Sequence, residues 1–306
     1  CFATNLAELF EPNIEFFDAI WPTLEANADK YLKAVKSPYI AESGTGANGI
    51  AIGSSGTPYR TPTVNASAST HTGPGSTGYT SDLFWQYYQF TMDDTMLKEK
   101  IYPYLEGAAT FLSKTLEEYD GKWLVSHSAS PENNMYFEDP FVTVGTMFDQ
   151  MMTRESFVQV LEAARLLKYT AADSPILATI ESQLDKLDPV NVGKSGHVKE
   201  YREETYYGDF GRYEHHGMAQ LVGVYPGTTI TNATDALALA EKECTVDYTQ
   251  VKVYRDEAAG IWKIEYQIFY GYQGYQYVYL NDDGITVMIS GAGSKVEEWQ
   301  ADYPGP

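Results

Sequence analysis

Five segments within the first 187 residues carry apolar side chains at the spacing of an α-helix, and this periodicity restricts the fold more than any other feature. They are residues 6–35, 82–90, 95–116, 144–167 and 174–187. Side chains three or four positions apart share one face of a helix, so each segment has an apolar stripe that must pack against another element. Pro12 and Pro22 make the first segment either one kinked helix or two shorter helices. The pattern predicts a mainly α fold for this part of the chain.

Long loops separate the helical segments. Residues 41–78 consist mostly of Gly, Ser, Thr, Ala and Asn, and residues 121–140 and 190–227 combine Gly and Pro with aromatic residues. Loops of this length in compact domains usually bind or cover a ligand. Ser174 followed by Pro175 has the residue types of a helix start, with the serine as N-cap. We therefore look for functional residues in the loops.

The character of the sequence changes after residue 230. A short helical segment at residues 233–243 precedes stretches rich in β-branched and aromatic residues. Three strands are predicted, at residues 250–255, 261–269 and 276–289. Asn281 to Gly284 are turn-forming residues that would divide the last stretch into a hairpin. The chain is thus predicted to contain a helical domain at residues 1–230 and a small α+β module at residues 231–306.

The charge of the chain excludes some partners. It has 42 acidic and 21 basic residues, a formal net charge of −21 at pH 7. Such a surface repels the phosphate backbone, so we expect no nucleic acid partner. Aromatic residues make up 14% of the chain, and its 25 tyrosines suit either stacking on sugar rings or a tyrosine-rich core. Both interpretations stay open.

Cysteine usage and hydropathy limit the remaining classes. The two cysteines, Cys1 and Cys244, allow one disulfide at most and no zinc cluster. No apolar run approaches the roughly 20 residues of a membrane span, so we expect none. Cys1 is consistent with a lipid-anchored N-terminus and equally with a boundary that happens to fall on a cysteine. No phosphate loop or dinucleotide fingerprint is present, so no cofactor is predicted.

Glu132 is the strongest candidate for proton transfer. It follows Pro131 in a loop that also contains Asn133 and Tyr136. A carboxyl group held in an apolar pocket has a raised pKa and can donate a proton. The same residues also fit a helix start, with Ser130 as N-cap and Glu132 near the positive end of the helix. Taken by themselves, the residues make the helix start the simpler interpretation.

A second cluster lies further along the chain. Glu200 and Tyr201 occur in one loop, and His215 and His216 follow shortly after. Such side chains could line a polar sugar site. Adjacent histidines point in different directions, and no His-Glu-x-x-His motif supports zinc. We therefore predict no metal at this cluster.

Five short motifs in the correct order resemble glycoside hydrolase family 95, the inverting α-L-fucosidases and their relatives. They are TNLAEL at residues 4–9, DLFWQYYQFT at 82–91, SPEN at 130–133, GHVKEY at 196–201 and QLVGVYPG at 220–227. The resemblance covers about residues 4–230. It implies a partial (α/α)6 helical toroid, a fucosylated or related glycan as substrate, and Glu132 as general acid. It also implies that seven residues contact the substrate, namely Trp85, Asn133, Tyr136, Glu200, Tyr201, His215 and His216.

This sequence departs from the family pattern in the residues that activate water. Family members use an asparagine polarised by an aspartate, within Asn-x-Asn and Ile-Asp-Gly-Asn motifs, and neither motif occurs here. Gly217 also replaces a histidine of the family's His-Arg-His segment. Glu200, Asp209 and Glu214 are candidate substitutes. Three hypotheses therefore stand: a glycosidase, a non-catalytic glycan-binding or surface-assembly protein, and a fragment whose base lies elsewhere.

The C-terminal module resembles the peptidase-propeptide-type modules common in secreted bacterial proteins, over residues 232–291. The resemblance implies an inhibitory, binding or spacer role and an extracytoplasmic location. Aromatic residues alternate along residues 266–279 without a single charge. This stretch suits pairing at a sheet edge, either against the helices or in a homo-oligomer, and a plain hairpin is the alternative.

Overall fold

The computed structural model describes most of the helical region and the strands of the C-terminal module. The described residues are 6–52, 55–57, 60–63, 73–131, 143–188, 191, 194, 198–205, 219–223, 227–228, 250–256, 261–268, 274–281 and 288–290. The chain divides into two compact units. The first contains residues 1–190, 200–202 and 210–219, and the second contains residues 191–199, 203–209 and 220–306. The domain boundary near residue 230 stays a prediction.

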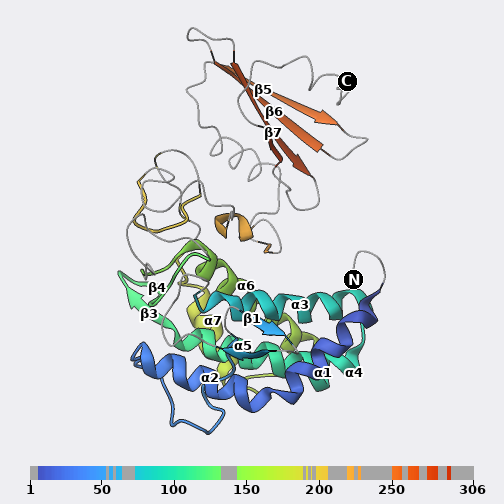
Figure 1. The fold of residues 1–306 in the computed structure, drawn as a ribbon, viewed down its shortest axis with the longest axis vertical. Coiled ribbons are helices and arrows are strands. Elements are labelled where there is room, and N and C mark those ends of the chain that lie inside the picture. Colours follow the sequence, from blue (N-terminus) through green and yellow to red (C-terminus); the bar gives the residue numbers. More distant parts are fainter. Residues whose placement is uncertain are drawn as a thin grey trace. The chain divides into compact units, whose positions relative to one another are not determined.

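The first unit is mainly helical, which confirms the fold class expected there (Figure 1). Its α-helices are α1 (Glu11–Ala19), α2 (Trp21–Ala34), α3 (Gly75–Thr91), α4 (Asp94–Met96), α5 (Tyr102–Lys114), α6 (Met147–Leu167) and α7 (Ile176–Leu184). A 3-10 helix at Ala7–Phe10 precedes α1, and a π-helical turn at Leu97–Ile101 joins α4 to α5. Two antiparallel strand pairs complete the unit: β1 (Ser55–Thr57) with β2 (Arg60–Thr63), and β3 (Leu116–Tyr119) with β4 (Lys122–Val125).

Prolines mark the helix starts as predicted. Pro12 and Pro22 lie in the first turns of α1 and α2, so the two-helix alternative is confirmed. The prediction for Ser174 is wrong, because the N-cap of α7 is Pro175 and no side chain caps the helix. The hydroxyl of Ser174 instead donates to the carboxylate of Glu106 on α5. A strong tertiary acceptor has taken the place of the local helix cap.

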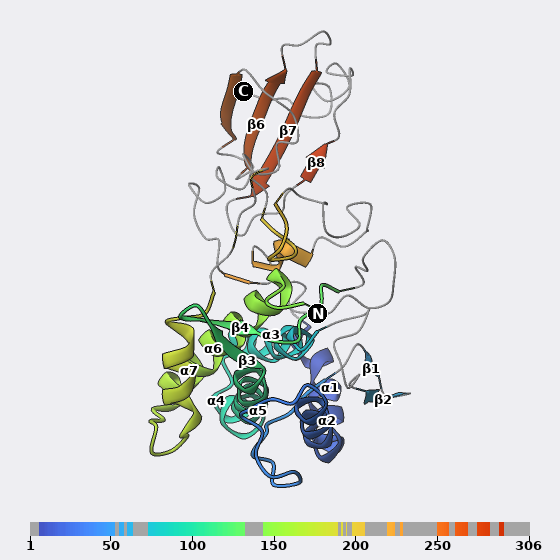
Figure 2. The same ribbon diagram turned by 90° about the vertical axis from the view of Figure 1, so that its left-hand side faces the viewer.

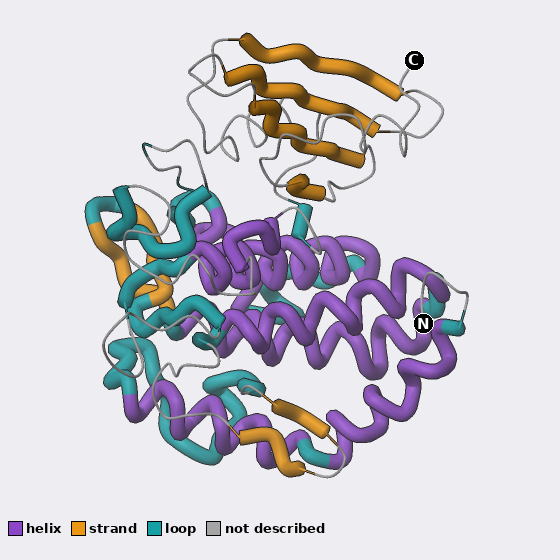
Figure 3. Tube along the Cα trace, turned by 45° about the horizontal axis from the view of Figure 1, so that its top comes forward, coloured by secondary structure: helices purple, strands orange, loops and turns teal. Residues whose placement is uncertain are grey.

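The core of this unit lies among helices that pack side by side (Figures 2 and 3). Helices α3, α5 and α6 contact one another, and α7 covers α5 and α6. The rings of Phe84 on α3 and Tyr104 on α5 are stacked with centroids 3.8 Å apart. Phe17 on α1 contacts both rings edge to face. This aromatic cluster joins three helices at a buried point.

The second unit contains an antiparallel sheet. Its strands are β5 (Gln250–Asp256), β6 (Ile261–Ile268), β7 (Gly274–Asn281) and β8 (Met288–Ser290), in the order β5-β6-β7-β8. The three predicted strands are therefore confirmed, and the last is the predicted hairpin of β7 and β8. A 3-10 helix spans Ala219–Gly223.

Residues 266–268 and 274–279 lie on strands β6 and β7, which pair with each other, so the plain-hairpin alternative is confirmed for these residues. Strands β6 and β7 are the inner strands, each hydrogen-bonded to a neighbour on both sides. Among the described strands β5 and β8 are the outer ones, and β8 pairs with residues 277–279 of β7. Pairing of the aromatic stretch at a sheet edge stays a prediction. A homo-oligomer stays a prediction. The helix expected at residues 233–243 lies outside the described residues.

Candidate functional site

The candidate site is built around the first turn of α6, where Asp149 is fully buried. Its carboxylate accepts hydrogen bonds from the backbone N–H of Gly75 (2.7 Å), the hydroxyl of Ser128 (2.6 Å) and the backbone N–H of Ala129 (3.2 Å). Burial raises the pKa of Asp149 from 3.8 to about 6, although these hydrogen bonds lower it. The start of α3 and the loop after β4 thus meet at one carboxylate.

Two glycines allow this close approach. A Cβ atom at Gly73 would lie 2.1 Å from Asp149 Oδ2, and one at Gly75 would lie 2.5 Å from Asp149 Oδ1. The backbone before α3 reaches the carboxylate only because these residues have no side chains. The Gly-Pro-Gly turn, to which the sequence alone assigns no role, is therefore a packing requirement of the site. The hydrogen bond from Gly75 also explains why α3 begins seven residues before its predicted start.

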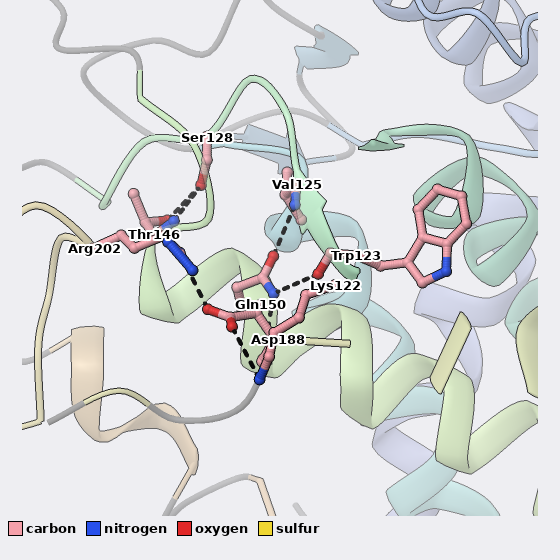
Figure 4. Close-up of polar contacts among 8 residues, drawn as sticks. All are labelled: Lys122, Trp123, Val125, Ser128, Thr146, Gln150, Asp188 and Arg202. Carbon is pink, nitrogen blue, oxygen red and sulfur yellow. Dashed lines mark hydrogen bonds and ion pairs between the residues drawn. The ribbon is translucent and has the colours of Figure 1, made fainter. Parts of the chain in front are cut away.

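Ser128 is held by both its side chain and its backbone. Its hydroxyl oxygen lies 2.6 Å from Thr146 Oγ1 and accepts a hydrogen bond from the backbone N–H of Thr146 at 2.9 Å (Figure 4). Its backbone exchanges two hydrogen bonds with Thr143, at 2.9 and 2.8 Å. These contacts leave the loop little freedom at this residue.

Gln150, the neighbour of Asp149, anchors the preceding strand. Its Oε1 accepts from the backbone N–H of Val125 at 2.8 Å, and its Nε2 donates to the carbonyl oxygens of Trp123 (3.3 Å) and Asp188 (3.4 Å). Figure 4 shows the amide lying among these three backbone groups. One side chain thus fixes β4 and the residues after α7.

Asp188 connects this scaffold to the loop that carries Glu200 and Tyr201. Its side chain is buried, and it accepts from Arg202 Nε at 3.2 Å and lies 3.7 Å from Lys122 Nζ. Both cations are partly exposed, so the ion pairs extend from the interior to the surface. The ion pair with Asp188 holds Arg202, and with it the adjacent Tyr201, close to the residues that follow α7.

The loop that leads to Glu132 has two further anchors. The hydroxyl of Tyr31 on α2 donates to the carbonyl oxygen of His127 at 2.8 Å. The hydroxyl of Ser130 donates to the carboxylate of Glu200, whose backbone carbonyl accepts from the N–H of Met147 at 3.1 Å. Every residue from 127 to 130 therefore has a tertiary hydrogen bond.

The predicted site residues fall into two groups. Glu200 (4% exposed) and Tyr201 (0%) are buried beside the loop, which the sequence did not indicate. Trp85 lies on α3, packs against the hydrophobic core and has its ring 5.5 Å from that of Tyr88, apart from the hydrogen bonds around Asp149. The other five, Glu132, Asn133, Tyr136, His215 and His216, lie outside the described residues, so their roles stay predictions.

Sequence reasoning missed the polar interior of α6. The buried polar side chains of α6 are those of Asp149, Gln150, Thr153, Glu155, Ser156 and Gln159. Polar residues at helical spacing normally indicate a solvent-exposed face, so this pattern gave no sign of burial. The available signal was the low charge of residues 147–159, of which only Asp149, Arg154 and Glu155 are charged.

A second buried carboxylate lies at the α3–α6 contact. Asp82 accepts from Gln159 Nε2 at 2.8 Å and from Gln86 Nε2 at 2.5 Å. Burial raises its pKa from 3.8 to about 6. Asp82 resembles Asp149 in burial and charge but is bound by glutamine side chains rather than by the loop.

Other site types receive no support in the described part of the chain. Those residues contain no group of three or more His, Cys, Asp or Glu side chains arranged to hold a metal ion. None of the helices described is long and apolar enough to cross a membrane. A cavity of about 300 Å³ between α2 and α5 is lined by Trp21, Glu25 and Glu106 among others, and by none of the predicted site residues.

The chain is similar in sequence to two fucosidases. Alpha-L-fucosidase 2 of Arabidopsis thaliana is 30% identical over 153 residues, which are 48% of this chain and 17% of the relative. Probable alpha-fucosidase A of Aspergillus niger is 28% identical over 167 residues, which are 52% of this chain and 20% of the relative. The chain thus spans a minor part of these relatives. A putative kojibiose phosphorylase from human microbiome gives a TM-score of 0.34 at 8% identity, covering 70% of this chain and 46% of that chain.

The family assignment follows from a match that covers most of the chain. The model of the glycosyl hydrolase family 95 catalytic domain matches residues 1–268. The protein therefore belongs to glycosyl hydrolase family 95.

Proposed function

We propose that this chain acts on fucosylated or related glycans as an inverting glycoside hydrolase, with Glu132 as the general acid. Membership of family 95 supports the reaction class, and the names of the two fucosidase relatives support the sugar. The observation that carries the proposal is the anchoring of residues 127–130, directly before Pro131 and Glu132. A general acid must be held in a fixed geometry by a rigid supporting shell.

Covalent geometry transmits this anchoring to Glu132. Pro131 has its φ angle restricted to about −65°, and consecutive Cα atoms lie about 3.8 Å apart. The backbone of Glu132 therefore starts within two residues of the anchored Ser130.

In the proposed reaction, Glu132 protonates the glycosidic oxygen while a second group activates water on the opposite face of the sugar. The two carboxyl groups of inverting enzymes are typically about 6.5–9.5 Å apart. Of the three candidates for activating water, Glu200 is buried and accepts a hydrogen bond from the Ser130 hydroxyl. We assign it a supporting role, which leaves Asp209 and Glu214. Asn133, Tyr136, His215 and His216 are proposed to contact the sugar, with Trp85 and Tyr201 behind them.

Glycan binding without hydrolysis is the second candidate function. The burial of Glu200 favours it, because one of the three acidic residues that could activate water is already engaged. On either function we propose an extracytoplasmic location, where fucosylated glycans occur, and an accessory role for the C-terminal module.

Rates on a fucosylated oligosaccharide test the proposal. We expect hydrolysis by the wild-type chain and a loss of about 10²- to 10⁴-fold in Glu132→Gln. Glu118→Gln, which changes an exposed carboxylate on β3, is the control and should leave the rate unchanged. Saturable binding measured by calorimetry without turnover would establish the second candidate function. Neither binding nor turnover would refute both.

A further inference from the structure

We propose that Asp149 is the positioning residue of the general-acid loop: its carboxylate connects the start of α3 to residues 128 and 129 and so sets the place of Glu132. This inference rests on the proposed function. Asp149 itself is fully buried on α6 and does not touch the substrate in this proposal.

The two carboxylate oxygens of Asp149 bind different segments of the chain. Oδ1 accepts from Gly75 N–H at the start of α3, whereas Oδ2 accepts from both the hydroxyl of Ser128 and the N–H of Ala129. All three partners are donors, so the group must be able to accept on both oxygens. Only an ionised carboxylate does this without conflict.

The hydroxyls around Ser128 form a directed chain. The Ser128 hydroxyl donates a hydrogen bond to Asp149. Its oxygen can therefore accept hydrogen bonds from the Thr146 hydroxyl and from the Thr146 backbone N–H. The Thr146 side chain also forms a hydrogen bond with Asp149, so both hydroxyls bind at the same carboxylate. A neutral side chain at this position would leave the Ser128 proton without its partner.

Asp149→Asn therefore tests these hydrogen bonds specifically, because asparagine has nearly the same size as aspartate but carries no charge. The amide offers one acceptor oxygen, and its NH2 group must face either Gly75 N–H or the two donors of the loop. One of the two segments is released in either orientation, because a donor then meets a donor. The proposal predicts that the loop moves away from its productive position.

Asp82→Asn is the matched control. Asp82 is likewise a buried aspartate whose pKa is raised to about 6. Its partners are Gln86 and Gln159, and a glutamine amide can turn its oxygen toward the new amide. The two variants change the same chemistry in the same helical unit, and only one of them touches the loop.

The first measurement is hydrogen–deuterium exchange, which does not depend on activity. In Asp149→Asn the peptide covering residues 124–131 should exchange on the order of 10-fold faster, as expected for the loss of about one hydrogen bond. Asp82→Asn should leave that peptide unchanged. Equal exchange in the wild type and Asp149→Asn would overturn the proposal, whether or not the chain hydrolyses glycosides.

The second measurement separates positioning from a general loss of folded protein. A misplaced acid should lower kcat on a fucosyl oligosaccharide by about 10²-fold, with KM within about twofold. The loss should be much smaller on 4-nitrophenyl α-L-fucoside, because nitrophenolate leaves without a proton. A proportional loss on both substrates would contradict positioning. If the wild type is inactive while the exchange result holds, the proposed function fails and the positioning of the loop stands.

A second variant covers a failure of Asp149→Asn to fold. Ser128→Ala removes one donor from the loop side and leaves the bond from Gly75 to Asp149 intact. We expect the same pattern with smaller changes. Unchanged exchange over residues 124–131 in this variant would also overturn the proposal.

Discussion

Replacing Asp149 should change the pH dependence of stability in a defined direction. Burial raises its pKa from 3.8 to about 6, so the folded protein binds a proton there more tightly than the unfolded chain. A raised pKa gives stability that is fully present below about pH 3.8 and is lost as the pH rises through about 6. The shift corresponds to about 3 kcal/mol, at about 1.4 kcal/mol for each pH unit.

The quantity to measure is the free energy of unfolding of the wild type minus that of Asp149→Asn, by urea titration between pH 4 and pH 7.5. Titrating groups whose surroundings are the same in both proteins cancel in this difference. Tyr31, whose pKa is raised by its burial and by the charge of Asp149, stays neutral throughout the window. We expect the difference to fall by about 2.5 kcal/mol from pH 4 to pH 7.5.

The control Ala26→Ser, at an exposed position of α2, changes no titratable group and should give a flat difference. A flat curve for Asp149→Asn would refute the desolvation on which the reasoning rests. A difference that increases with pH would mean that the hydrogen bonds outweigh burial. The sign of the slope therefore decides which effect wins.

Three further substitutions test the packing of the helical unit by chemical denaturation. Gly75→Ala should cost about 2 kcal/mol or more, because its Cβ would lie 2.5 Å from Asp149 Oδ1; a cost under about 0.5 kcal/mol would contradict the close approach. Arg202→Ala should cost about 1–3 kcal/mol by removing a cation that is paired with the buried Asp188, and Arg202→Lys should recover part of this; equal stability of all three proteins would refute the pairing. Phe84→Ala should cost about 3–5 kcal/mol through loss of the aromatic cluster, and a cost under about 1 kcal/mol would contradict its burial.

Local signals in the sequence were sufficient for the longer helices and for β5, β6 and β7, whereas the short strands β1 to β4 were not predicted. Pro12 and Pro22 indicated either kinks or helix starts, and the structure shows starts, because a proline lacks the N–H that the first turn does not use. The strands at residues 250–256 and 261–268 were found within one residue of their ends, since β-branched and aromatic residues are concentrated there. These features depend on neighbouring residues alone.

Tertiary partners decided what local signals could not. Ser174 was expected to cap α7, but its hydroxyl donates a hydrogen bond to Glu106 on α5 instead. Asp149 has no distinctive local context, and its role depends on donors 74 and 21 residues away in the chain. The family motifs identified the loop that contains Glu132. The carboxylates that hold this loop could not be derived from spacing.

The anomeric configuration of the first sugar released tests the central claim most directly. Proton NMR can follow the hydrolysis of a fucosyl oligosaccharide by the wild-type chain before mutarotation mixes the two forms. An inverting mechanism with Glu132 as general acid predicts that β-L-fucose appears first and that its formation falls about 10²- to 10⁴-fold in Glu132→Gln. Initial release of α-L-fucose, or an undiminished rate in Glu132→Gln, would contradict the account.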